Sequence, residues 1–100
     1  MRSGYKIEWT VKSIKDLKSI NNYLTKRWTE REIIKFYMLL ERRLELISRN
    51  PDAFPSSNVR INVKRCLLSK QTSIYFEVKR ENILILTLFD NRKNPKALKI

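Results

Sequence analysis

The first third of the chain passes from an alternating pattern of apolar residues to a helical one. Tyr5, Ile7 and Trp9 alternate with polar neighbours, which predicts a short strand. Thr10 follows and is a residue type that caps helices. From there apolar residues recur at steps of three and four, the spacing of an amphipathic helix: Val11, Ile14, Leu17, Ile20, Leu24 and Trp28.

A second helix is predicted directly after the first, because Thr29 and Glu32 form the T-x-x-E pattern of a capping box. We expect this helix to end before Pro51, since the residue that precedes a proline resists helical geometry. Together the two segments predict an antiparallel helical hairpin. The apolar stripe of the second helix consists of Ile33, Phe36, Tyr37, Leu40, Leu44 and Ile47.

Three strand-like segments follow a turn-rich connector, NPDAFPSSN, in which Phe54 is expected to plug the edge of the core. In the first segment, residues 59–68, Val59, Ile61 and Val63 alternate with polar residues. The second, residues 73–78, points Ile74, Phe76 and Val78 inward. The third, residues 83–89, is apolar on both faces, which is typical of a central strand. Four-residue links between the segments predict hairpins.

The order of these elements predicts an α+β fold in a single domain that spans residues 1–100. An N-terminal strand and a helical hairpin precede a three-stranded antiparallel meander. We expect all the strands to form one antiparallel sheet with both helices packed on one of its faces.

Charge dominates the composition. Twenty-two Lys and Arg residues against ten Asp and Glu residues give a net charge of +12 on 100 residues. Such a field attracts polyanions, which include nucleic acid, an acidic protein or an anionic membrane face. Solubility alone is the simpler interpretation of the same charge.

Several classes of chemistry are excluded by residues that the chain lacks. There is no histidine, which removes Ser-His and Cys-His nucleophiles and histidine-bound metal. One glycine cannot build a phosphate-binding loop, and the acids are too dispersed to pair. We therefore expect no cofactor and no metal.

The single cysteine and the short apolar segments indicate the cellular compartment of the protein. Cys66 lies among apolar neighbours, so we expect a buried and unreactive thiol, and one cysteine fits a reducing cytosol. The sequence MRSGYKIEW lacks the apolar core of a secretory signal, and no apolar run approaches the ~20 residues of a membrane span. A cytoplasmic protein without a membrane partner is predicted.

Candidate binding residues follow from the cations and their neighbours. Arg60, Lys64 and Arg65 could stand on a sheet face left free by the helices and bind phosphates, although a solvated strand face would look the same. Tyr75 has the opposite parity from Phe76 and could stack on a base or fill a partner's pocket. Asp90 ends the last strand, where it could accept from turn amides or hold Arg65 or Arg92. The tail beyond it adds Arg92, Lys93 and Lys96.

With these motifs in order, the chain resembles the RelE/ParE superfamily of toxins from bacterial type II toxin–antitoxin pairs. The resemblance runs from Tyr5 to Leu98 and includes D-L-x-x-I-x-x-Y-L, NPDAFP and the F-D-x-R-x-x-P end. It implies a small basic toxin that is neutralised by an acidic, partly disordered antitoxin, with which it can form a hetero-oligomer.

The same resemblance offers two activities. RelE-type members cut messenger RNA on the ribosome, whereas ParE-type members are gyrase inhibitors without a nuclease site. Lys64 and Arg92 lie near positions at which nucleases of the RelE type keep basic residues, so Lys64, Arg65 and Arg92 are the candidates if this chain is a nuclease. Cys66 stands where a second lysine is expected and Ser73 where an arginine is expected, which favours the ParE type.

Three functions thus remain in order of preference. The first is a ParE-like toxin that binds an essential gyrase-type target. The second is a ribosome-dependent mRNA endoribonuclease, and the third is a basic nucleic-acid-binding module without toxicity. In the toxin reading, replacing Arg92 is expected to reduce toxicity or antitoxin affinity more than replacing Lys12.

Overall fold

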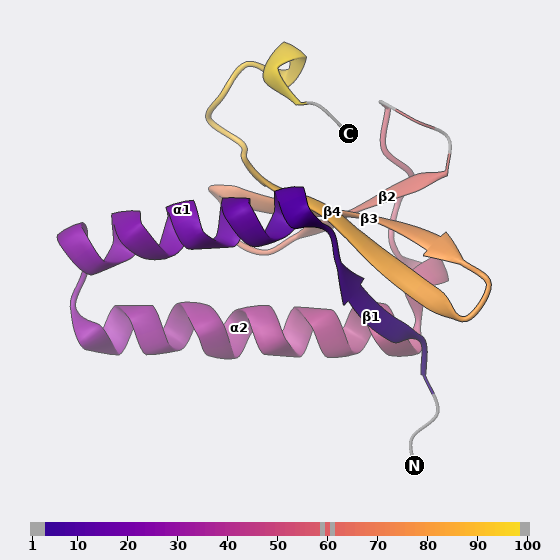
Figure 1. The fold of residues 1–100 in the computed structure, drawn as a ribbon, viewed down its shortest axis with the longest axis horizontal. Coiled ribbons are helices and arrows are strands. Elements are labelled where there is room, and N and C mark those ends of the chain that lie inside the picture. Colours follow the sequence, from indigo (N-terminus) through magenta and orange to yellow (C-terminus); the bar gives the residue numbers. More distant parts are fainter. Residues whose placement is uncertain (1–3, 59, 61, 99–100) are drawn as a thin grey trace.

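The computed structural model describes residues 4–58, 60 and 62–98, and Figure 1 shows how their elements are arranged. The predicted order of one strand, two helices and three strands is confirmed. The elements are β1 (Lys6–Trp9), α1 (Val11–Arg27), α2 (Glu30–Arg49), β2 (Val63–Leu67), β3 (Thr72–Lys79) and β4 (Asn82–Asp90), with short 3₁₀ turns η1 (Pro51–Ala53) and η2 (Pro95–Ala97). In this part of the chain no helix is long and apolar enough to cross a membrane.

The four strands form one sheet in the order β1-β4-β3-β2, so β4 is central as its two apolar faces predicted. β2, β3 and β4 form the expected antiparallel meander. The prediction of a wholly antiparallel sheet is wrong, because β1 runs parallel to β4, with Lys6 opposite Asn82 and Trp9 opposite Ile85. After β1 the chain runs out along α1 and back along α2, so that β2 starts at the same end of the sheet as β1. Parallel strands require a long crossover of this kind.

Both helices begin at the threonines that the sequence marks. The Thr10 hydroxyl accepts from the Ser13 amide at the start of α1. At the start of α2, Thr29 and Glu32 form both halves of the capping box. The corner between the helices therefore occupies only Trp28 and Thr29, which keeps α1 and α2 side by side (Figure 1).

The connector after α2 packs along the outer edge of β2. Ser56 forms a bridge with Lys64, and the Arg65 amide donates to the carbonyl of Pro55 at 3.0 Å. Phe54 meets Phe76 edge to face, with 5.7 Å between ring centroids, so it plugs the edge of the core as predicted. β2 is shorter than the predicted segment 59–68, and Val59 and Ile61 lie outside the described residues.

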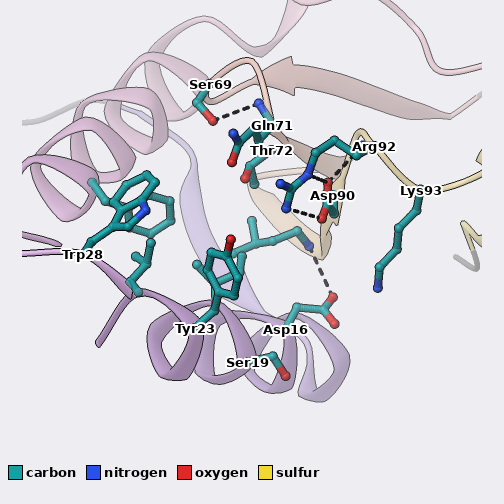
Figure 2. A pocket seen from close by; sticks show the side chains of 14 residues that line it. Asp16, Ser19, Tyr23, Trp28, Ser69, Gln71, Thr72, Asp90, Arg92 and Lys93 are labelled. Carbon is teal, nitrogen blue, oxygen red and sulfur yellow. Dashed lines mark hydrogen bonds and ion pairs between the residues drawn. The ribbon is translucent and has the colours of Figure 1, made fainter. Parts of the chain in front are cut away.

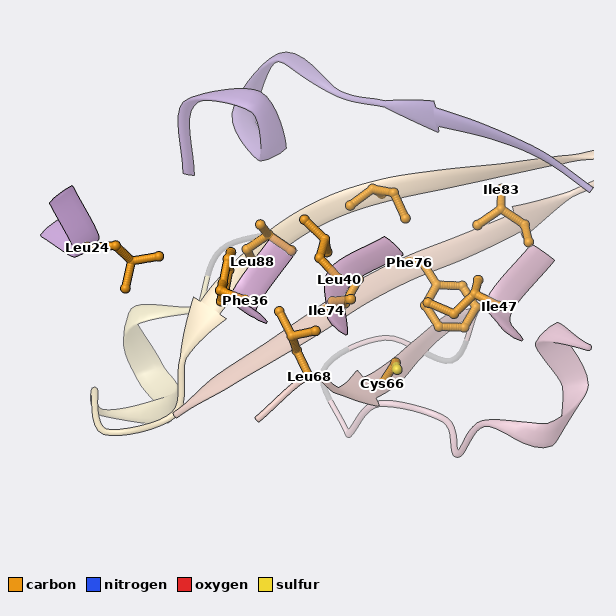
Figure 3. Packing of buried hydrophobic residues seen from close by; sticks show 11 residues of the cluster. Leu24, Phe36, Leu40, Ile47, Cys66, Leu68, Ile74, Phe76, Ile83 and Leu88 are labelled. Atoms are coloured by element: carbon orange, nitrogen blue, oxygen red, sulfur yellow. The ribbon is translucent and has the colours of Figure 1, made fainter. Parts of the chain in front are cut away.

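The core lies between α2 and the sheet, with the inner side of α1 completing it (Figure 3). Apolar side chains that alternate along β3 and β4 meet the stripe of α2, as their periods predicted. The fully buried part of this cluster, at 0% exposure, consists of Ile47, Ile74, Phe76, Ile83 and Ile85.

Cys66 is buried in this core, and its burial raises the pKa of the thiol, an effect that nearby Arg43 partly opposes. The folded chain thus favours the protonated thiol. Its contribution to the free energy of unfolding is fully present below the ordinary thiol pKa and is lost as the pH rises from there through the raised pKa.

We predict that iodoacetamide at pH 8 alkylates Cys66 at least about tenfold more slowly in the native protein than in urea. Equal rates would contradict the buried, unreactive thiol.

Candidate functional site

The polar end of β4 forms a fixed ion pair. Arg92 donates to Asp90 from Nε at 3.0 Å and from Nη2 at 2.9 Å, and its backbone amide donates to the same carboxylate at 2.9 Å. These bonds hold the pKa of Asp90 below its usual range, since they stabilise the carboxylate. Of the partners expected for Asp90, it therefore binds a turn amide and Arg92, whereas Arg65 binds elsewhere.

A cleft of about 370 Å³ opens beside this ion pair, between the helical hairpin and the end of the sheet. Leu24, Phe36 and Leu88 lie at its base and are buried in the core. Figure 2 shows Tyr23 and Trp28 on the helical side and Arg92 on the opposite side. We call this hollow the Arg92 cleft; its lining also includes Asp16, Ser19, Ile20, Ser69, Gln71, Thr72, Asp90 and Lys93.

Tyr23 lies between two guanidinium groups. The Arg27 guanidinium stands over the Tyr23 ring, 5.3 Å from its centroid, in a cation–π contact. Arg92 has its pKa raised chiefly by its hydrogen bonds to Asp90, and its proximity to Tyr23 raises the pKa further. The aromatic wall of the cleft is thus bounded by cations on both sides.

The sheet face away from α2, which we call the open face, carries a chain of hydrogen bonds rather than a continuous basic surface. Arg65 donates to Ser73 at 3.0 Å, and Ser73 donates to Asn91 at 2.7 Å. Arg60 pairs with Glu77 at 3.5 Å. This network joins β2 and β3 to the start of the tail, so Arg60 and Arg65 both have partners within the protein.

Lys64 and Tyr75 do not lie on an exposed basic face as the sequence predicts. Lys64 lies opposite Phe76 in register, and its amine donates to the carbonyl of Phe54 at 3.2 Å. It therefore stands on the opposite side of β2 from Arg65. Tyr75 does have the opposite parity from Phe76, but it is 8% exposed and packs edge to face against Phe89.

The tail lysines complete the set of predicted site residues. Lys93 lines the Arg92 cleft, and Lys96 is exposed in η2. The structure thus brings together Asp90, Arg92 and Lys93 at one site. Lys64, Arg65 and Tyr75 lie in β2 and β3, Arg60 precedes β2, and none of the four lines this cleft.

Sequence reasoning missed the helical side of the cleft. The helical period places Trp28 in an apolar stripe, yet it is 38% exposed, and Tyr23 is 41% exposed. Asp16 was counted among dispersed acids, although it pairs with Lys12 and accepts from Thr87 and the Leu88 amide. A lysine four residues before Asp16 is a signal for the first of these contacts but not for those across the fold.

The acidic groups of the cleft are paired with neighbouring cations. The two carboxylates of the cleft are ion-paired, Asp16 with Lys12 and Asp90 with Arg92. Within residues 4–58, 60 and 62–98, no group of three potential ligands could hold a metal ion. What the cleft offers is an apolar base, two aromatic rings and cations at the rim.

Comparison with known proteins identifies the family. The family model described as the ParE toxin of the type II toxin–antitoxin system parDE matches residues 7–95. No curated protein sequence matches this chain closely enough to count as a relative. Among solved structures, a chain of the chromosomal ParDE toxin–antitoxin system from P. aeruginosa has a similar fold, with a TM-score of 0.71 and 19% identity over 86% of this chain and 95% of that one.

A second solved structure shares the fold at lower similarity. It is the solution structure of the conserved hypothetical protein HP0894 from Helicobacter pylori, with a TM-score of 0.59 and 12% identity over 89% of this chain and 97% of that one. These two likenesses concern the fold, whereas the family model covers most of the sequence. The chain therefore belongs to the ParE toxin family of type II toxin–antitoxin systems.

Proposed function

We propose that this chain arrests bacterial growth as a non-enzymatic ParE-type toxin, by binding an essential target of the gyrase type. We further propose that a cognate acidic antitoxin neutralises it by folding across its basic surface. Cytoplasmic action without a membrane partner is part of this proposal.

The observation that supports a binder over a nuclease is the separation of the three candidate catalytic cations. The amine of Lys64 is bound to the Phe54 carbonyl, the guanidinium of Arg65 to Ser73, and that of Arg92 to Asp90. Stabilising the transition state of phosphoryl transfer requires charged groups that converge on one phosphate. Lys64 and Arg65 point to opposite faces of β2, so they do not converge.

The charge supports an acidic antitoxin. The net charge of +12 remains after all ten acids of this chain are counted against its 22 Lys and Arg residues, so it has no counterpart within the chain. A disordered acidic segment that folds onto such a surface gains electrostatic attraction and loses conformational entropy at the same step. We expect the complex to be a hetero-oligomer.

The test is induction of the chain alone in a bacterial host. We predict that colony counts fall by orders of magnitude, that plasmid supercoiling changes, and that transcripts stay intact. Arg92→Ala is expected to restore most colonies, because Arg92 is the fixed cation at the rim of the cleft. Measurement of colony number, plasmid topology and transcript integrity in the same cells checks all three.

The matched control is Lys15→Ala, which removes one exposed positive charge from α1. Lys12 is less suitable than the sequence implied, because it pairs with Asp16 and donates to Thr87. Cut transcripts with unchanged supercoiling would contradict the proposal and favour the endoribonuclease. Full viability with folded protein present would favour the basic nucleic-acid-binding module.

A further inference from the structure

The Arg92 cleft combines an apolar base with exposed aromatic walls. Leu24, Phe36 and Leu88 are 3%, 9% and 5% exposed, so the base belongs to the core and is held rigidly. Tyr23 and Trp28 retain about two-fifths of their surface in solvent at the mouth (Figure 2). Exposed aromatic rings beside a concave apolar surface are characteristic of sites that anchor a partner's side chain.

The rim supplies positive charge in a fixed orientation. A guanidinium has five N–H groups. Two of those on Arg92 bond to Asp90, which leaves the remaining N–H groups for a partner. Because Asp90 already holds the Arg92 guanidinium, Arg92 loses less side-chain freedom when it binds an incoming carboxylate. Lys93 extends the positive rim.

The same cleft disfavours a phosphodiester chain. Among the described residues that line it, Arg92 and Lys93 are the only cations, which is few for a backbone that carries one negative charge per nucleotide. The base is formed by two leucines and a phenylalanine, which offer no hydrogen bonds to the edge of a nucleobase. An apolar side chain, in contrast, would remove apolar surface from water on both partners.

We propose that the Arg92 cleft binds a single apolar side chain from an acidic peptide segment, and that Arg92 binds a carboxylate next to that anchor. The partner is thus a protein segment in which an aliphatic or aromatic residue is flanked by Asp or Glu. This inference rests on the proposed function, since an acidic antitoxin is the partner that would present such a segment.

The test uses the purified chain and labelled peptides, with fluorescence anisotropy as the readout. The first probe is a 12-residue peptide of Glu and Ser with one central Leu, and the second has Ala in its place. An oligothymidylate of equal charge is the third probe. We expect the Leu peptide to bind roughly tenfold more tightly than the Ala peptide, because only the leucine buries apolar surface in the cleft.

Two variants locate the contact. Ser19→Trp fills the cleft from its exposed rim and should abolish the preference for Leu over Ala. Arg92→Gln should lower the affinity for both peptides by roughly tenfold, since it removes the positive charge but leaves the apolar base of the cleft intact. Lys15→Ala is the matched control for charge and should change both affinities only slightly. Circular dichroism of each variant confirms that it is folded.

The outcomes separate this inference from the proposed toxicity. Equal affinity for the Leu and Ala peptides would overturn the anchor site, as would a Leu preference that survives Ser19→Trp. Tighter binding of the oligothymidylate that is lost in Arg92→Gln would make the cleft a nucleic-acid site instead. If the chain prefers the Leu peptide through the cleft but is not toxic, the proposed function is refuted, and the cleft remains a peptide-binding site.

Discussion

Replacing Phe76 by alanine is expected to lower the free energy of unfolding by about 3–5 kcal/mol, the usual cost of removing a large buried ring. Phe76 is fully buried in β3, opposite Ile85 of the central strand, and meets Phe54 edge to face. Total stabilities of small domains are only about 5–15 kcal/mol, so the variant should unfold at a far lower urea concentration. Urea titration followed by circular dichroism measures the change.

Phe89→Ala is the matched control for this change. Phe89 lies in β4 on the open face and is only half-buried, so the same truncation there should cost much less. Similar losses for the two variants would mean that the core is not centred on the helix-covered face. A loss at Phe76 of under about 1 kcal/mol would contradict the tight packing described for this side chain.

Asp16→Ala is expected to cost about 2–4 kcal/mol, an unusually large effect for a residue on the polar side of a helix. β1 ends at Trp9, so on the side away from β3 no strand lies beside Thr87 and Leu88 of β4. Asp16 takes that place, because its carboxylate accepts from the Leu88 amide at 3.3 Å and from the Thr87 hydroxyl. Thr87 is 1% exposed, so water cannot readily replace the lost acceptor.

Asp16→Asn separates the hydrogen bonds from the charge. The amide oxygen can still accept from Thr87 or Leu88, so Asp16→Asn should lower the free energy of unfolding less than Asp16→Ala does. The remaining decrease comes mainly from removing the ion pair with Lys12. Asp52→Ala removes an exposed acid from η1 and should change stability by less than about 0.5 kcal/mol. Thermal unfolding of the three variants tests this order, and an Asp16→Ala variant as stable as Asp52→Ala would contradict it.

The parts of the fold that were predictable from the sequence are those that depend on neighbouring residues. The helical periods, the capping box at Thr29 and the central position of β4 are all local signals, and the structure confirms them. The direction of β1 was not predictable, because it depends on the route of the chain through two helices. The parity of Tyr75 was read correctly, but its burial depends on Phe89 in another strand.

The candidate site was predictable only at its C-terminal side. The F-D-x-R pattern identified Asp90 and Arg92, and their ion pair follows from their spacing of two residues. The opposite wall comes from α1 and the corner at Trp28, more than sixty residues earlier in the chain. The amphipathic period assigns Trp28 to the core, because it cannot show where a helical hairpin extends past the end of the sheet.

The connector that lies along β2 also limits how a partner can attach. An unpaired outer strand is the usual template for β-augmentation and for edge-to-edge aggregation. Here Pro55 and Ser56 already occupy positions beside β2, so an incoming strand would have to displace them before it could extend the sheet at that end. A partner that approaches this edge is thereby directed to side-chain recognition, and the chain avoids templating its own copies through it.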